Sequence, residues 1–172
     1  MKFYCGIGSR KTPKAVLSDM TSLAGLLAEN DYCLRSGHAE GADMAFEKGC
    51  DLYQGVKEIF LPWPYFNNAS GQDPGIKSVR PSIRARKRAA EVIPHWYNCS
   101  DAAQQLHGRN VHQVLGLTFT EPVEFVICLT KGGVEIGGTR TAMMIAHKHN
   151  IPVINMYFDD WITKLEKLVD FK

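Results

Sequence analysis

Residues 2–30 read KFYCGIGSRKTPKAVLSDMTSLAGLLAEN, and this stretch decides the fold. Residues 2–7 form a short apolar run that is typical of a buried strand. Pro13 suits the first turn of a helix over residues 13–29, and Thr12 is its expected N-cap. The apolar residues of that segment recur four, three and four positions apart, which is helical spacing: Val16, Met20, Leu23 and Leu27. A strand, a glycine turn and an amphipathic helix in this order begin a βαβ unit.

The same alternation continues along the chain. Further strands are expected at 31–35, 56–61, 123–129 and 151–155, and further helices at 40–53, 82–92, 100–116, 139–149 and after Asp159 or Asp160. Residues 62–81 are rich in Pro, Gly, Asn and Ser and are expected to form a long loop. Alternating strands and helices predict a single α/β domain over residues 1–172. It would be a Rossmann-like three-layer sandwich with a mostly parallel sheet of five or more strands.

Composition narrows the class of protein. The chain has 172 residues, of which 45% are hydrophobic and 22% charged, so a folded domain is expected rather than a disordered chain. The formal net charge of +2 is too small to indicate a nucleic-acid-binding protein by itself. The five cysteines are odd in number and include no CxxC pair, so neither a disulfide framework nor a zinc site is expected. We also expect no other metal and no cofactor. No signal peptide or membrane-length apolar stretch is apparent, so we expect a cytoplasmic protein without membrane contact.

Three glycine-containing turns are expected where strands end and helices begin. They are residues 6–10 (GIGSR), 36–43 (SGHAEGAD) and 130–139 (TKGGVEIGGT). Glycine lets a ligand approach the backbone, and a helix N-terminus offers free N–H groups and a partial positive charge. One such turn alone has a steric explanation, whereas three at one edge of a parallel sheet favour a phosphate site. The ligand-binding candidates here are Gly8, Ser9, Arg10, Ser36, Gly37, His38, Gly41, Asp43, Gly137, Gly138 and Thr139.

These turns resemble the core motifs of DprA/Smf proteins and of the wider SLOG superfamily. Residues 58–63 (EIFLPW), 109–116 (RNVHQVLG) and 151–155 (IPVIN) extend the resemblance over most of the chain. It is nearest to small phage-encoded DprA-like recombination mediators. The resemblance implies a Rossmann-like fold, a nucleotide or single-stranded nucleic acid as partner, and a homo-oligomer. In DprA the first two turns contact single-stranded DNA, which implicates Ser9, Arg10, Ser36 and Gly37, and the match at 109–116 adds Arg109 and Asn110 as ligand contacts.

The chain departs from the enzymes of the superfamily at one position. LOG enzymes carry Gly-Gly-x-Gly-Thr-x-x-Glu with a catalytic glutamate, whereas Gly138 and Thr139 here are followed by RTA. The resemblance therefore implies a non-catalytic binding module. Two alternatives stay open: a nucleotide-processing N-glycosidase or transferase with Asp43 or Glu135 as acid/base, and a protein that sequesters or senses a small nucleotide signal. The same residues also have structural explanations, because Asp43 can compensate a helix N-terminus and His38 and Glu135 can be solvated.

Residues 77–88 carry six basic residues and no acidic one, close to the aromatic loop residues Trp63, Tyr65 and Phe66. Basic and aromatic side chains together suit single-stranded nucleic acid. A solvated helix face is the commoner outcome for such a run of charge.

Overall fold

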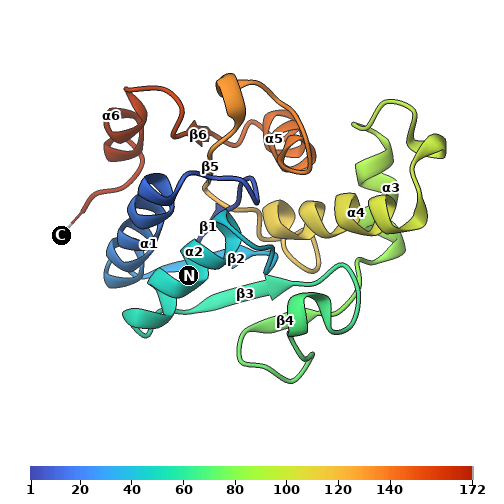
Figure 1. Ribbon diagram of the computed structural model, residues 1–172, viewed down its shortest axis with the longest axis horizontal. Helices are drawn as coiled ribbons and strands as arrows, with labels where there is room; N and C mark the ends of the chain where they lie inside the picture. The colour runs from blue at the N-terminus through green and yellow to red at the C-terminus, as the bar shows by residue number, and fades with distance from the viewer. Residues whose placement is uncertain (172) are drawn as a thin grey trace.

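The computed structural model describes residues 1–171 and confirms the α/β class. Its sheet has six strands, all parallel, in the order β4-β3-β2-β1-β5-β6 (Figure 1). The strands are β1 (Lys2–Gly6), β2 (Tyr32–Ser36), β3 (Lys57–Phe60), β4 (Ile76–Ser78), β5 (Phe125–Cys128) and β6 (Val153–Asn155). The helices are α1 (Lys14–Glu29), α2 (Ala42–Leu52), α3 (Ile83–Ala90), α4 (Asp101–Leu115), α5 (Thr139–Lys148) and α6 (Trp161–Glu166). Three short 3-10 helices are η1 (Phe66–Asn68), η2 (Trp96–Asn98) and η3 (Lys131–Gly133).

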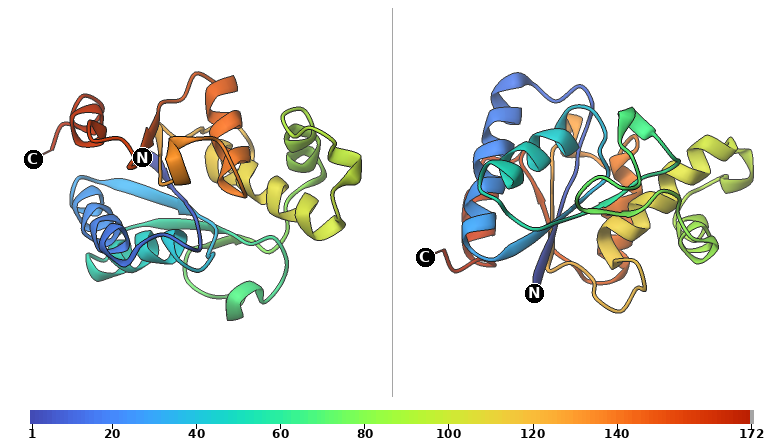
Figure 2. Two further views of the ribbon diagram at one scale, coloured as in Figure 1. Left: turned by 45° about the horizontal axis from the view of Figure 1, so that its top comes forward. Right: turned by 90° about the horizontal axis from the view of Figure 1, so that it is seen from below.

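The helices cover both faces of the sheet, which makes three layers (Figure 2). Alternate residues of β1 face opposite sides, as the strand period requires. Phe3 and Cys5 pack with α3, α4 and α5, whereas Tyr4 packs with α1, α2 and α6. Each face therefore has its own apolar cluster, and the sheet between them is buried on both sides, as parallel sheets are.

Two local expectations are wrong. Residues 76–78 form strand β4 inside the expected loop, where they pair with β3 at the edge of the sheet. Thr12 does not cap α1: Pro13 takes the N-cap position without a side-chain hydrogen bond, and the Thr12 hydroxyl donates to the carbonyl of Ser9 over 2.8 Å. Three residues are too few for hydrophobic periodicity to reveal a strand, which explains why β4 escapes prediction.

The strand order reverses between β1 and β5, because β2 leaves β1 in one direction and β5 lies on its other side. In open parallel sheets such a reversal opens a crevice beyond the carboxyl ends of the two strands. The carboxyl end of β1 leads into residues 7–13, and that of β5 leads into residues 129–138. The topology thus puts two of the three glycine turns on either side of one opening.

The described part of the chain contains no helix long and apolar enough to cross a membrane. Within residues 1–171 all five cysteines are free thiols, and no group of three or more His, Cys, Asp or Glu side chains could hold a metal ion.

Candidate functional site

A cleft of about 1140 Å³ opens at the reversal between β1 and β5. Its walls come from the β1–α1 turn, the start of α2, the loop after β3, one face of α4 and the turn between β5 and α5. Nine of the thirteen sequence-predicted ligand residues line it: Gly8, Ser9, Arg10, Asp43, Arg109, Asn110, Gly137, Gly138 and Thr139. The structure therefore brings together residues from four separate segments of the chain.

Three helices begin at this cleft. The N-cap positions of α1, α2 and α5 are Pro13, Gly41 and Gly138, and none of the three helices receives a side-chain cap. The first N–H groups of a helix lack partners within the helix, and its dipole adds partial positive charge there. In α2 the N–H groups of Ala42 and Met44 already donate to the carbonyls of Ser9 and Ala39, so the starts of α1 and α5 are the two N-termini that can attract an anion to the opening.

The turn between β5 and α5 presents bare backbone to solvent. A Cβ atom added to Gly132, Gly137 or Gly138 would meet no atom within 4 Å, so the space over these residues is open. Gly132 and Gly137 have φ values of 69° and 64°, a region that favours glycine. Asn110 on α4 holds the turn in place by donating from Nδ2 to the carbonyl of Gly138 over 2.6 Å. A ligand can therefore approach the peptide groups at the start of α5 closely.

Four cationic side chains and two carboxylates line the cleft. The cations are Arg10, Lys11, Arg109 and Lys131, and the carboxylates are Glu40 and Asp43. Arg10, Lys11 and Lys131 are exposed, and each is without an ion pair in the part of the chain that the structure describes. Arg10 therefore does not brace Asp43, and its guanidinium is free to bind an anion.

Asp43 pairs instead with Arg109, with 3.2 Å between Oδ2 and Nη1. Both side chains are buried, with 4% and 7% of their surface exposed. Burial raises the pKa of Asp43 to about 6, although Arg109 opposes the shift. The carboxylate also accepts a hydrogen bond from the N–H of Ala39 over 3.4 Å. Asp43 thus joins the second turn to α4.

Polar atoms beside this pair lack partners. Nε of Arg109 and both amide atoms of Gln113 are buried without a hydrogen bond among the described residues. Gln113 lies four residues after Arg109 on α4, so the two share one helix face. A buried polar group without a hydrogen bond destabilises the folded state, and here such groups belong to residues that line the cleft floor. The floor therefore has spare donors and an acceptor.

One wall of the cleft is aromatic. Trp63 and Phe66, from the loop after β3, meet edge to face with 5.2 Å between ring centroids. The guanidinium carbon of Arg109 lies 5.9 Å from the centroid of Phe66. Aromatic faces beside cations are the surface on which nucleobases stack.

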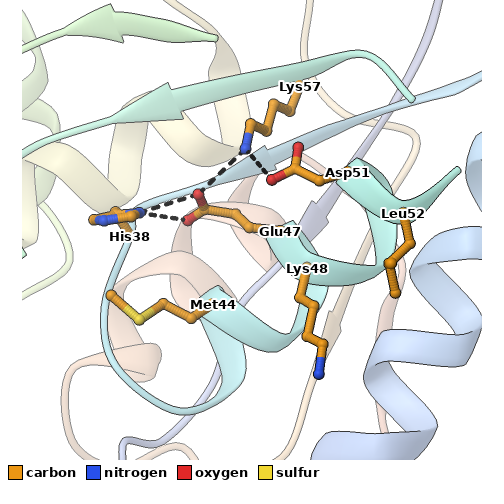
Figure 3. Close-up of a pocket in the computed structure, with 7 residues that line it drawn as sticks. All are labelled: His38, Met44, Glu47, Lys48, Asp51, Leu52 and Lys57. Carbon is orange, nitrogen blue, oxygen red and sulfur yellow. Dashed lines mark hydrogen bonds and ion pairs between the residues drawn. The ribbon is translucent and has the colours of Figure 1, made fainter. Parts of the chain in front are cut away.

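His38 turns away from the cleft into a smaller pocket on the outer side of α2 (Figure 3). Its Nδ1 lies 3.0 Å from Oε2 of Glu47, and this hydrogen bond raises the pKa of His38. Lys57 completes the cluster by pairing with Asp51 and Glu47 at 2.7 and 3.8 Å (Figure 3). The carbonyl of His38 accepts from Nδ2 of Asn67 over 2.8 Å, so His38 ties the second turn to the aromatic loop.

Four further predicted residues lie off the cleft lining. Ser36 is buried and donates its hydroxyl to the carbonyl of Gly6 over 2.7 Å. Gly37 packs against Arg109 so closely that a Cβ atom would collide with the guanidinium. Gly41, with φ 84°, supports the backbone of Ser9 and Arg10 from behind. Glu135, the second acid/base candidate, pairs with His147 at 2.8 Å outside the cleft.

Sequence reasoning missed Gln113 and Lys131 as cleft residues. The i, i+4 spacing from Arg109 was the available signal for Gln113. Lys131 lies inside the third glycine turn, and its position next to Gly132 and Gly133 was the available signal.

No family model matches the chain, and neither does any curated protein. Two solved structures are similar in fold. A structural-genomics target named TM1055 is 19% identical, with a TM-score of 0.51, over 89% of this chain and 72% of that one. DNA processing protein A (DprA) from Streptococcus pneumoniae is 20% identical, with a TM-score of 0.54, over 96% of this chain and 56% of DprA. The chain thus spans little more than half the length of DprA and shares its Rossmann-like fold over nearly all of its own length.

Proposed function

We propose that this protein binds single-stranded nucleic acid or a nucleotide through its phosphates, in the cleft between β1 and β5, without catalysing a reaction on it. The observation that carries the proposal is the meeting of two uncapped helix N-termini, those of α1 and α5, with three exposed cations that form no ion pair among the described residues. Backbone N–H groups and Arg10 would hold the phosphates, with Ser9 and Thr139 as hydroxyl donors. The fold shared with DprA supports a nucleic-acid ligand, and the nearer likeness to phage recombination mediators remains a prediction from motifs.

The aromatic wall of the cleft favours a ligand that carries bases, and the size of the cleft leaves room for more than one nucleotide. About 1140 Å³ exceeds the ~300–1,000 Å³ typical of small-molecule pockets. Trp63 and Phe66 offer base-stacking surface, which inorganic phosphate would not use.

Fluorescence anisotropy with labelled oligo-dT and with labelled AMP, each at several salt concentrations, tests the proposal. Oligo-dT should bind, and its affinity should fall steeply as salt rises, because phosphate contacts release counterions. Binding of AMP alone would support the sensing of a small nucleotide. Binding of neither ligand at low salt would contradict the proposal.

A second candidate function is N-glycosidase or transferase chemistry on a nucleotide. The observation that favours it is Asp43, a buried carboxyl at the cleft with a pKa of about 6, near that of an effective general acid or base. Incubation with nucleoside monophosphates and chromatography for released base would detect it. Base release that Asp43→Asn abolishes would establish the enzyme.

A further inference from the structure

Two short turns of the chain share a sequence pattern and a backbone shape. Residues 64–70 read PYFNNAS and residues 94–100 read PHWYNCS. Each turn has a left-handed residue after its proline, then a 3-10 helix, then an extended residue. The left-handed residues are Tyr65 and His95, with φ values of 61° and 55°. The turns differ at their centre, where only the first has further positive φ values, at Asn67 and Asn68.

The same two backbone hydrogen bonds close both turns. In residues 64–70 the N–H groups of Asn68 and Ala69 donate to the carbonyls of Tyr65 and Phe66, each over 3.1 Å. In residues 94–100 the corresponding bonds measure 2.8 and 3.0 Å and join Asn98 to His95 and Cys99 to Trp96. The first turn supplies Phe66 to the cleft wall.

The second turn is fixed to α4 just beyond the cleft. Gln104 donates its side-chain amide to the carbonyls of Trp96 and Cys99 over 3.4 and 3.2 Å. The Trp96 ring lies 6.3 Å from that of His107. Leu106, between those two contact positions, lines the cleft. Along the axis of α4 the turn therefore lies within about one helical turn of Leu106, but it packs on a different face of the helix from the one that lines the cleft, since Leu106 points about 100° away from His107.

The second turn holds a large aromatic side chain in solvent. Tyr97 is 94% exposed, the highest value among the exposed large hydrophobic side chains of the described residues. Trp96 beneath it is only partly buried and packs on the core. A backbone secured by four hydrogen bonds thus presents Tyr97 outward without support from its own burial.

The helix before this turn is basic on its free face. Arg84 and Lys87, three apart, share one exposed face of α3, and the exposed Arg80 precedes the helix. Arg84 also donates from Nη1 to the carbonyl of Thr118 over 3.3 Å and lies 4.7 Å from the centroid of the Phe119 ring. None of the three forms an ion pair with another described residue, and residues 74–90 contain no acidic side chain. In every view α3 and residues 91–100 project together at the far end of α4 (Figure 1, Figure 2).

We propose that residues 94–100 and the basic face of α3 form a second contact for single-stranded nucleic acid, in which Tyr97 stacks on a base of the strand that occupies the cleft. The inference rests on the proposed function and extends it beyond the cleft. The charge of α3 suits a phosphate backbone, and an exposed tyrosine held beside it suits a base. A mononucleotide in the cleft does not reach this surface, so only a longer strand uses it.

A length series tests the second contact. Oligo-dT of about 4 to about 16 nucleotides covers the site sizes usual for single-strand-binding grooves. We expect Tyr97→Ala to weaken the longest oligonucleotides by about fivefold to a hundredfold, the effect of losing one stacking side chain, and to leave the shortest unchanged. Tyr97→Phe keeps the ring and should bind every length as the wild type does. An unchanged melting temperature would show that the fold is intact, as expected for a side chain so exposed.

The basic side chains of α3 allow a second, independent test of the proposal. Lys87→Ala should reduce the slope of log affinity against log salt for long oligonucleotides only, whereas Lys48→Ala, an exposed lysine on α2, should not change it. Equal affinity of wild type and Tyr97→Ala at every length, with unchanged slopes for Lys87→Ala, would overturn the second contact and leave the cleft proposal standing. Failure of all oligonucleotides to bind the wild type would overturn both.

Discussion

At the scale of single residues, Arg10 has the clearest role to test. Its guanidinium is exposed at the cleft and free of carboxylates among the described residues, so it contributes little to the fold. Arg10→Ala should weaken oligonucleotide binding by about tenfold to a hundredfold, as loss of a charge-assisted hydrogen bond does. Calorimetry would measure the affinity, and thermal melting without ligand would serve as control. A large drop in melting temperature with unchanged affinity would show a structural role instead.

Asp43 should make binding depend on pH. At pH 7 a carboxyl with a pKa of about 6 is mostly ionised, and a phosphodiester placed nearby raises that pKa further by repulsion. Binding should therefore take up protons, and affinity should fall as pH rises from about 6 to about 8. Calorimetry in buffers of different ionisation enthalpy would count the protons. Asp43→Asn should remove both the uptake and the pH dependence, and a wild type that takes up no protons would contradict the prediction.

The site residues divide by how far local sequence determines their position. Ser9 and Arg10 come shortly after β1, and Thr139 begins α5 at the end of the turn that follows β5, so their place at the sheet edge follows from topology. His38 lies in an equally suitable turn, but its left-handed backbone, φ 58°, and the buried Glu47 draw its ring to the other side of α2. That partner lies nine residues away, and nothing in the turn itself indicates it.

At the scale of elements, the turn before α5 allows a matched pair of substitutions. Gly138 has a helical backbone, φ −64°, and open space over it, so Gly138→Ala should leave the melting temperature unchanged. The added methyl group would cover the start of α5 and weaken phosphate binding. Gly137 has φ 64°, so Gly137→Ala should destabilise the fold by about 1–2 kcal/mol. Unchanged oligonucleotide affinity in Gly138→Ala would show that this helix start does not contact the ligand.

Most elements could be predicted because their apolar periodicity is long and regular. The 16 residues of α1 give several repeats of the helical pattern, and β5 is a continuous apolar run. β4 could not be predicted, since none of its three residues is fully buried and they pair on the edge of the sheet. The strand ends also shift by one or two residues, as for residues 123–129 against the observed Phe125–Cys128.

At the scale of the whole molecule, the small net charge of +2 does not reveal that basic side chains are concentrated at the cleft. If the three exposed cleft cations each contact a phosphate, log affinity should fall against log salt with a slope of about −2, at ~0.7 per contact for a single strand. Arg10→Ala should reduce that slope by about 0.7. Anisotropy titrations over a range of salt would give both values, and a slope near zero would exclude phosphate contacts.

The homo-oligomer and the cytoplasmic location stay predictions. Sedimentation velocity on the wild-type protein, with and without oligonucleotide, would measure the assembly state. A monomer under both conditions would contradict the oligomer that the sequence resemblance implies.

The order of the strands also determines when the site can exist during synthesis on the ribosome. β1 is central in the sheet, and one of its neighbours, β5, is not made until residues 125–128. Until then β1 has an open side, and the cleft lacks the wall formed by the turn between β5 and α5. A nascent chain therefore acquires β1 and β2 early but completes its binding site only when Tyr157, the last residue that lines the cleft, has left the ribosome, so ligand cannot guide the first steps of folding.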